Sequence, residues 1–324
     1  MIRNPRIVLA GSVNSSRAIM EKLIQHEMNL VGVLGLALEK QKDVSGFCDL
    51  GVICRGNSVP FRDFLNLNSP EIVEHIRLLQ PDLLFVVGLS QLVASELLQV
   101  PTHGVIGYHP TRLPEGRGRG TIAWLVLGKA PAAVTFFQID EGMDSGPIWF
   151  QVPFEVEESD YAQDVIDKVV RAICAGLDKA LPGLKLGKLD CEPQDHSKAT
   201  YLGVRRPQDG LINWSASAIE IARLVRAVSK PLPGAYTYLK NKKMIVQRAT
   251  VSTIRNHFGV PGRLLLADAS DGYIIQTGDG LLRLEEVEGI EFQHLRPGVK
   301  LGLDFETELM ALRNAQERKS KCKD

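Results

Sequence analysis

His109 and Asp144 are the two residues of this sequence whose types and surroundings best suit acid–base chemistry. His109 follows the apolar run 105–106 and precedes a proline, which places it where a buried strand is expected to end. Asp144 lies in the acidic turn 140–146, directly after a second apolar run, 133–139. A carboxylate beside an imidazole raises its pKa and fixes its tautomer. The two residues together would make a general base near neutral pH.

The two runs are predicted to bring this pair to one edge of a sheet. Strands joined by one crossover present their carboxyl ends at the same edge, so we expect His109 and Asp144 to meet there. The residues alone leave a second interpretation open, in which His109 closes a turn and the acidic residues form a solvated hairpin loop. Between the runs lies the loop 113–120, which holds Arg117 and Arg119. It is too basic and too flexible to be core, and it is suited to approach an anion.

The chain before this region has the pattern of a Rossmann-type α/β domain. Apolar runs at 6–11, 30–36 and 81–87 predict parallel strands, and the serines at 15–16 are suited to begin a helix. The first turn, GSVNSS, lacks the G-x-G-x-x-G spacing, so a dinucleotide site is not expected. A later helix is predicted from apolar residues at three- and four-residue spacing, Val165, Ile166, Val169 and Ile173, and is expected to end at Pro182-Gly183.

Composition bounds the partners of the protein. The 38 basic residues balance 38 acidic ones, and this neutral balance argues against a nucleic-acid partner while leaving a local basic patch open. The five cysteines have no metal-ligand spacing, so no metal site is predicted. No run of eighteen apolar residues occurs, and we expect a cytoplasmic protein without a membrane partner.

The last third of the chain predicts a second, β-rich domain. From about residue 205 short segments alternate apolar and polar residues and are separated by Pro-Gly and Asp-Gly turn signals, which is typical of a small open β-barrel. We therefore expect a first domain over 1–203, a second over 204–313 and a charged tail over 314–324. The second domain would bind substrate or build a homodimer, and the sequence does not distinguish these.

The region 104–151 resembles the signature of the formyltransferases that use 10-formyltetrahydrofolate, and residues 205–236 resemble the C-terminal domain found in that family. The matching positions in the first region are His109-Pro110-Thr111, Leu113-Pro114, Arg117-Gly118, Thr135, Asp140, Gly142, Asp144-Ser145-Gly146, Ile148 and Gln151. So many spaced matches are specific. The resemblance implies an α/β, Rossmann-like catalytic domain followed by a small OB-like β-barrel.

The resemblance also implies roles for single residues. His109 and Asp144 match the catalytic pair that relays the proton of an attacking amine. The loop after the third strand and the acidic turn match the segments that hold the pteridine of the folate. The cofactor-binding residues implied in this way are Leu89, Ser90, Gln91, Leu92, Asp140 and Gly142.

The acceptor is predicted from the version of the loop that this chain carries. The order Arg117-Gly118-Arg119 resembles formyltransferases that act on nucleotide-linked amino sugars, and implies that Thr111, Arg117 and Arg119 bind such a sugar nucleotide. Two arginines are suited to bind diphosphate oxygens. Another interpretation is that Arg117 only ties down its own loop. The alternative acceptor is methionyl-tRNA.

Gly107 departs from the family pattern, which has an asparagine two residues before the histidine. That asparagine would donate an amide hydrogen bond to the oxyanion of the tetrahedral intermediate, and losing one such donor costs about 2.7–4 kcal/mol. A donor must then come from elsewhere, such as His109 or a backbone amide. Gly107 therefore leaves open a third reading, in which the protein hydrolyses 10-formyltetrahydrofolate or only binds folate.

Overall fold

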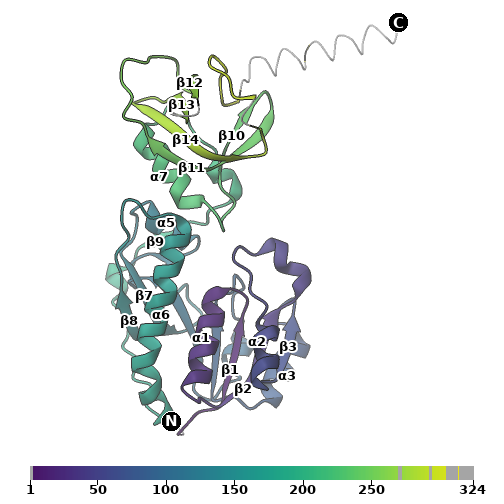
Figure 1. Ribbon diagram of the computed structural model, residues 1–324. Helices are drawn as coiled ribbons and strands as arrows, with labels where there is room; N and C mark the ends of the chain where they lie inside the picture. The colour runs from purple at the N-terminus through teal and green to yellow at the C-terminus, as the bar shows by residue number, and fades with distance from the viewer. Residues whose placement is uncertain (1–2, 269–271, 292–293, 304–312, 314–324) are drawn as a thin grey trace, which may run out of the picture. The chain divides into compact units, whose positions relative to one another are not determined.

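The computed structural model describes residues 3–268, 272–291, 294–303 and 313. The chain divides into two compact units, Met1–Arg205 and Arg206–Asp324 (Figure 1). The predicted tail, 314–324, lies outside the described residues. Each unit is described by itself below.

The first unit is built on a seven-stranded sheet with the order β3-β2-β1-β4-β5-β7-β8. The strands from β3 to β5 are parallel, and β7 and β8 are antiparallel to their neighbours. The apolar runs at the start of the chain form these strands because both faces of the sheet are covered. The bounds are β1 Ile7–Gly11, β2 Leu30–Leu36, β3 Phe61–Phe64, β4 Leu83–Val87, β5 Val105–Thr111, β7 Ala132–Gln138 and β8 Ile148–Pro153.

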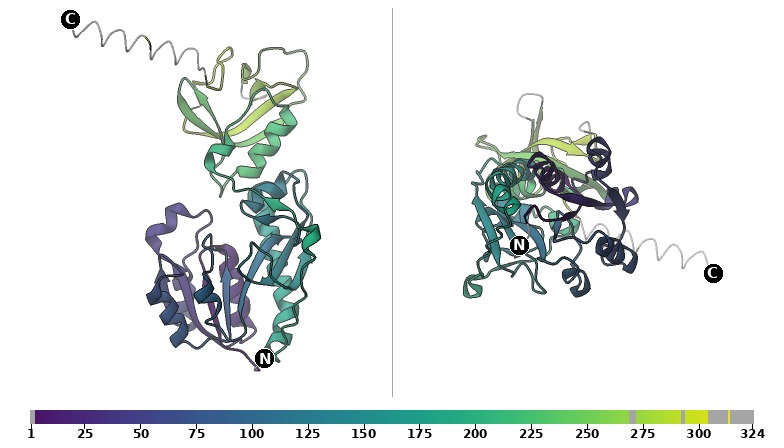
Figure 2. Two further views of the ribbon diagram at one scale, coloured as in Figure 1. Left: turned by 180° about the vertical axis from the view of Figure 1, so that it is seen from behind. Right: turned by 90° about the horizontal axis from the view of Figure 1, so that it is seen from below.

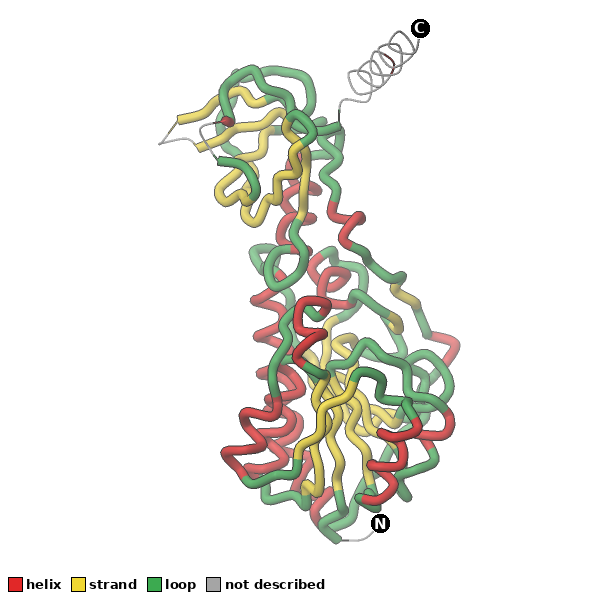
Figure 3. The backbone as a smooth tube through the Cα atoms, turned by 90° about the vertical axis from the view of Figure 1, so that its right-hand side faces the viewer, coloured by secondary structure: helices red, strands yellow, loops and turns green. Residues whose placement is uncertain are grey.

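Helices cover both faces of this sheet (Figures 2 and 3). α1 and α6 lie side by side and bury one core against the sheet, with Ile19, Leu177 and Phe85 among its members. α3 and α4 bury a second core on the opposite face, around Ile72 and Val86. The helices of this unit are α1 Asn14–Gln25, α2 Leu50–Asn57, α3 Pro70–Leu78, α4 Ser95–Leu98, α5 Thr121–Val126 and α6 Ala162–Lys185, with 3-10 turns η1 Leu38–Asp43 and η2 His196–Lys198.

The direction of β7 differs from the expectation. β7 is antiparallel to β5, with His109 opposite Thr135, so the carboxyl ends of these two strands point to opposite edges of the sheet. Asp144 still reaches His109 because the loop 139–147 turns back from the end of β7 toward the end of β5.

The loop 113–120, called the glycine-rich loop below, is also more ordered than predicted. Its residues Arg117–Gly118 form a short strand, β6, which pairs with β9, Tyr201–Leu202, near the end of the first unit. Arg117 is only 2% exposed. The expectation of a flexible loop outside the core was therefore wrong, because two glycines with φ of +77° and +114°, Gly116 and Gly118, fold the loop tightly against a segment that follows much later in the chain.

The second unit confirms the predicted β-rich domain as a five-stranded antiparallel sheet with the order β10-β11-β14-β13-β12. α7 packs on this sheet and begins at the capping box of Ser217 and Glu220. The bounds are η3 Pro207–Gly210, α7 Ala218–Val228, β10 Ala235–Leu239, β11 Lys242–Val251, β12 Leu264–Asp268, β13 Gly272–Gln276 and β14 Leu281–Glu288. Among the described residues, no helix has the length and apolar character needed to cross a membrane.

Candidate active site

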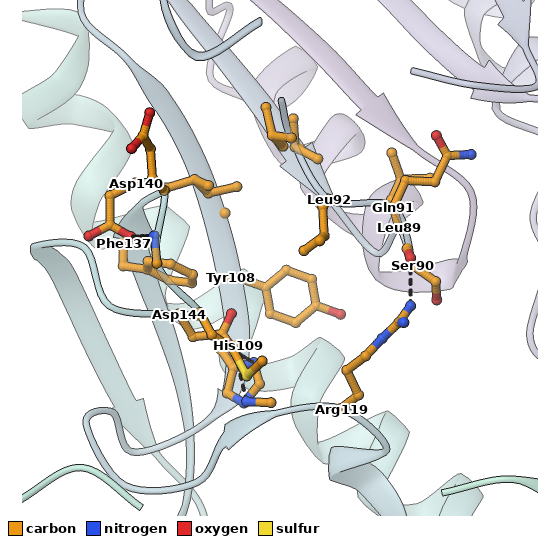
Figure 4. A pocket seen from close by; sticks show the side chains of 18 of the residues that line it. Leu89, Ser90, Gln91, Leu92, Tyr108, His109, Arg119, Phe137, Asp140 and Asp144 are labelled. Carbon is orange, nitrogen blue, oxygen red and sulfur yellow. Dashed lines mark hydrogen bonds and ion pairs between the residues drawn. The ribbon is translucent and has the colours of Figure 1, made fainter. Parts of the chain in front are cut away.

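A cavity of about 290 Å³ opens at the carboxyl ends of β4 and β5. Its walls are the segment after β4, the end of β5 and the turn after β7, and Figure 4 shows side chains from these segments gathered around Tyr108. Eight residues predicted from the sequence to form the catalytic and folate sites line it together. They are Leu89, Ser90, Gln91, Leu92, His109, Asp140, Gly142 and Asp144.

The ring of His109 is held in one orientation. Its Nε2 lies 2.8 Å from the carbonyl oxygen of Gly116. A carbonyl can only accept, so Nε2 carries the hydrogen and donates it, which leaves the lone pair of the neutral ring on Nδ1. The side chain is 7% exposed, and Nδ1 is the nitrogen that faces Asp144.

Asp144 is held beside this nitrogen by backbone geometry. Its Oδ2 accepts a hydrogen bond of 2.8 Å from the backbone N–H of Gly118 and lies 3.6 Å from His109 Nδ1. The backbone of Asp144 has a φ of +50°, in the left-handed region that costs most L-residues about 1–2 kcal/mol. At 3.6 Å the two groups are too far apart for a hydrogen bond, so Asp144 acts on His109 through its charge, which attracts the ring once the ring is protonated.

The surroundings set the protonation state of His109. Burial lowers the pKa of His109 below its ordinary value of 6.5, because the charged ring loses its hydration. The charge of Asp144 and the hydrogen bond to Gly116 raise that pKa in turn, and burial is the largest of the three effects. The ring is therefore neutral at pH 7, with an unprotonated Nδ1 at the cavity wall.

Replacing Gly118 with alanine is expected to move Asp144 away from His109. The new Cβ would lie 2.3 Å from the carbonyl oxygen of Leu202, and the φ of +114° disfavours any side chain. The loop must shift, and the N–H that holds Asp144 shifts with it. We expect kcat/KM for the protein's reaction to fall by about 100-fold, the size of effect that a misplacement near 1 Å produces.

Gly128 supplies the matched control for this change. It also has a positive φ, +68°, but its added Cβ would meet nothing within 4 Å. Gly128→Ala should therefore lose about 1–2 kcal/mol of stability to backbone strain alone and keep the wild-type kcat/KM. Equal kcat/KM for the two variants, measured with their thermal unfolding, would show that Gly118 does not hold Asp144.

The segment Leu89–Leu92 forms one wall of the cavity. The side chain of Gln91 turns away, since its Oε1 accepts from Leu67 N and its Nε2 donates to Leu65 O, both at 2.8 Å. Arg119 reaches this wall and donates to the carbonyl oxygen of Ser90 at 2.5 Å (Figure 4). Gln91 therefore shapes the segment, and Arg119 links it to the glycine-rich loop.

Asp140 and Gly142 shape the opposite wall. The Oδ1 of Asp140 accepts hydrogen bonds from the backbone of Gly142 at 3.0 Å and from the hydroxyl of Ser145 at 2.7 Å. A Cβ on Gly142 would lie 2.0 Å from the Ser145 oxygen. Both residues line the cavity, and their interactions keep the turn before Asp144 folded.

Two residues predicted to bind the acceptor lie outside this cavity. Thr111 is fully buried, and its hydroxyl donates to the carbonyl oxygen of Glu115 at 2.7 Å. Arg117 is buried, and its guanidinium donates to Gln194 at 2.7 Å and to His196 at 3.1 Å. These partners favour the interpretation that Arg117 ties down its own loop. They also give His196 a structural contact.

The structure adds residues that sequence reasoning missed. Tyr108 lines the cavity, and its hydroxyl donates to Ser15 at 2.6 Å; its place beside His109 was the only signal for it. Ile139 packs over Gly107, so a Cβ added to the glycine would lie 2.9 Å from the Ile139 Cδ1. The space of the missing asparagine is thus filled by an apolar side chain, and restoring an amide there requires Ile139 to move.

Two family models match this chain. The model described as "Formyl transferase" matches residues 53–181, and the model described as "Formyl transferase, C-terminal domain" matches residues 205–293. The first match covers His109 and Asp144, and the second covers most of the five-stranded sheet of the second unit.

Two curated relatives are similar over most of their length. A protein of Geobacter metallireducens named methionyl-tRNA formyltransferase is 33% identical over 263 residues, which are 78% of this chain and 83% of the relative. A protein of Chloroflexus aggregans with the same name is 30% identical over 87% of this chain and 92% of its own length. The fold resembles that of WlaRD, a sugar 3N-formyl transferase solved in the presence of dTDP and 5-N-formyl-THF, with a TM-score of 0.62, 17% identity and coverage of 88% and 98%.

Proposed function

This chain belongs to the formyltransferase family, and we propose that it transfers the formyl group of 10-formyltetrahydrofolate to the amino group of methionyl-tRNA. The observation that carries the chemistry is the single cavity in which His109 and Asp144 face the predicted folate-binding segments. The relatives at 30–33% identity, which are named as enzymes acting on methionyl-tRNA, support the acceptor.

The sequence-based prediction of an amino-sugar acceptor was wrong. The curated relatives named above, and others at similar identity, are methionyl-tRNA formyltransferases, whereas sugar formyltransferases resemble this chain only in fold, at 17–18% identity. The Arg117-Gly118-Arg119 motif misled because one of its two arginines is buried and bonded within the protein. It therefore does not form a pair of arginines open to a diphosphate.

The neutral net charge misled for a different reason, since it hides how charge is distributed. The turn between β10 and β11 and the first two residues of β11 expose three lysines, Lys240, Lys242 and Lys243, of which Lys243 lies over the ring of Tyr236. Contacts between lysine side chains and backbone phosphates supply a large share of the affinity of proteins for nucleic acid. A local basic turn in the second unit therefore supports a tRNA acceptor despite a formal net charge of zero.

The cavity suits the head group of a folate. Its 290 Å³ lies at the lower end of ligand pockets, which span roughly 300–1,000 Å³. That size fits the bicyclic pteridine, while the rest of the cosubstrate would extend through the open side. Leu89, Phe137 and Ile139 offer apolar contact to a flat ring, and the backbone groups of Leu89–Leu92 offer hydrogen bonds to its polar edge.

The geometry suggests how the chain moves the proton. The acceptor nitrogen attacks the formyl carbon and gains positive charge as the new C–N bond forms. His109 Nδ1 takes a proton from that nitrogen, and the negative charge of Asp144 stabilises the imidazolium that results. The oxyanion then collapses, the bond from the formyl carbon to N10 of the folate breaks, and the imidazolium returns the proton to N10.

This mechanism predicts the pH dependence of the reaction. The base form of His109 is required, and burial holds its pKa below 6.5, so kcat/KM should be constant from pH 7 to 8 and fall as the pH drops below 6.5. Asp144→Asn removes a charge that raises this pKa, so the same fall should occur at lower pH in that variant. An acid fall centred above pH 6.5 in the wild type, or one that Asp144→Asn does not move, would contradict His109 as the base.

The release of tetrahydrofolate from 10-formyltetrahydrofolate tests the proposed function. We expect release with methionyl-tRNA and none with uncharged tRNA, and a KM for the tRNA that rises steeply with salt because phosphate contacts release counterions. Release without any acceptor would instead indicate a hydrolase, the alternative that Gly107 leaves open. The cytoplasmic location expected from the sequence stays a prediction.

A further inference from the structure

Gln194 connects a late segment of the first unit to the turn that carries Asp144. It follows α6, lies fifty residues beyond Asp144, and is 6% exposed. Its Nε2 donates to two backbone carbonyl oxygens, that of Asp144 at 2.9 Å and that of Gly146 at 2.7 Å. The two amide hydrogens of Gln194 thus bond to the carbonyl groups of the residues before and after Ser145.

Arg117 fixes the orientation of this amide. Its Nη2 donates to Gln194 Oε1 at 2.7 Å, and a guanidinium can only donate. The oxygen of the Gln194 amide must therefore face Arg117, and the NH₂ group must face the turn. Arg117 is itself 2% exposed, and its hydrogen bond to Gln194 and the bond from Gln194 to Gly146 are buried, where hydrogen bonds are strongest, while the bond to Asp144 is partly buried.

The turn needs such support because its conformation is strained and tightly closed. Asp144 has a φ of +50°, and a Cβ on Gly146 would lie 1.8 Å from the carbonyl oxygen of Gln138. Rotation of the Asp144 backbone out of the left-handed region would swing its carboxylate away from the N–H of Gly118 and from His109. The two carbonyl contacts of Gln194 act directly against that rotation.

We infer that Gln194, oriented by Arg117, is a positioning residue that holds the carboxylate of Asp144 against His109. The inference deepens the proposed formyl transfer and rests on it for its effect on rate. Gln194 lies outside the cavity and contacts Asp144 only through the backbone. Its removal should therefore impair the chemical step and leave folate affinity unchanged.

Two substitutions separate the donor function of Gln194 from its bulk. Gln194→Glu keeps an oxygen for Arg117 but replaces the amide donor with an acceptor that faces two carbonyls, and Gln194→Ala removes the side chain. We expect both to lower kcat for formyl transfer by about 10-fold to 100-fold, the range that a small misplacement of a catalytic group produces. The dissociation constant for 10-formyltetrahydrofolate should stay within about two-fold.

Gln247 supplies the matched control. It is a glutamine of similar burial, 5% exposed, in the second unit, and its Oε1 accepts from Lys230 N at 3.2 Å. Gln247→Ala should lower the thermal unfolding midpoint, as Gln194→Ala does, and keep the wild-type kcat. A Gln194→Ala protein that is folded and has the kcat of the wild type would overturn the inference.

The titration of His109 gives a readout that does not need activity. The charge of Asp144 raises the pKa of His109, so loss of the correct Asp144 position should lower it. Histidine NMR resonances followed against pH should show His109 of Gln194→Ala protonating at a lower pH than in the wild type, in the same direction as Asp144→Asn. An unchanged His109 titration in Gln194→Ala would overturn the inference, and a wild type without formyl transfer would overturn only the proposed function.

Discussion

Replacing His109 with alanine should lower kcat by about 100-fold to 10,000-fold, the contribution typical of a general base in the transition state. The reason is that His109 Nδ1 is held beside Asp144 and, in its neutral form, is free to take the proton of the attacking amine. The folate wall is built by other segments, so 10-formyltetrahydrofolate should bind His109→Ala with nearly wild-type affinity. Stopped-time assays of tetrahydrofolate release and calorimetric titration of the folate measure the two quantities.

The control for His109→Ala is the loss of a histidine elsewhere. His75 lies on α3, away from the cavity, so His75→Ala should keep the wild-type kcat. Added imidazole should restore part of the activity of His109→Ala, since the substitution leaves a space beside Asp144. A His109→Ala protein that is folded and turns over at the wild-type rate would refute the assignment of the base.

Asp144→Asn should have the second largest effect, a loss of kcat on the order of 100-fold to 10,000-fold, as for other carboxylates that stabilise a catalytic imidazolium. Asparagine keeps an oxygen for the N–H of Gly118, so the turn should remain folded. What is lost is the charge that stabilises His109 after it has taken the proton. The test is kcat at pH 7.5, measured with thermal unfolding.

The charge itself can be separated from its position by a comparison within the first unit. Asp195→Asn removes an exposed carboxylate whose partners are Ser197 and Lys198, so it should leave kcat unchanged. The acid fall in kcat/KM should move to lower pH in Asp144→Asn and stay in place in Asp195→Asn. An Asp144→Asn enzyme with wild-type kcat would mean that the 3.6 Å contact carries no catalytic consequence.

Much of the first unit could be predicted because its strands are short, apolar and buried on both faces. The predicted strand at 30–36 coincides with β2, and the predicted strand at 81–87 contains β4. Alternation and Asp-Gly turns likewise predicted β13 and β14 in the second unit. Such elements depend on local periodicity, which a sequence displays directly.

The direction of β7 could not be predicted in the same way. Apolar periodicity is the same in a parallel and an antiparallel central strand, so the run 133–139 indicated a strand and not its direction. The crossover argument and the family motif both placed His109 and Asp144 together, but the crossover argument relied on strand ends that share one edge. The actual route runs through the loop 139–147, which turns back toward β5.

Contacts between segments that are distant in the sequence also could not be predicted. Arg117 appeared basic and accessible in the sequence, yet the segment around Gln194 and Tyr201 covers it. No local sequence pattern predicts the contact between Arg117 and Gln194, which are 77 residues apart. The same hidden contact explains why the motif around Arg117 suggested a sugar-nucleotide acceptor and why Gln194 received no role from the sequence.

A competition between acceptors in one reaction tests the proposed transfer to methionyl-tRNA most directly. The wild-type protein would be given 10-formyltetrahydrofolate together with methionyl-tRNA and a nucleotide-linked 4-amino sugar, and each acceptor would be analysed by mass spectrometry. We predict that the methionine gains one formyl group in step with tetrahydrofolate release, and that His109→Ala abolishes this gain. A formyl group on the amino sugar alone, or tetrahydrofolate release with no formylated acceptor, would contradict the proposed function.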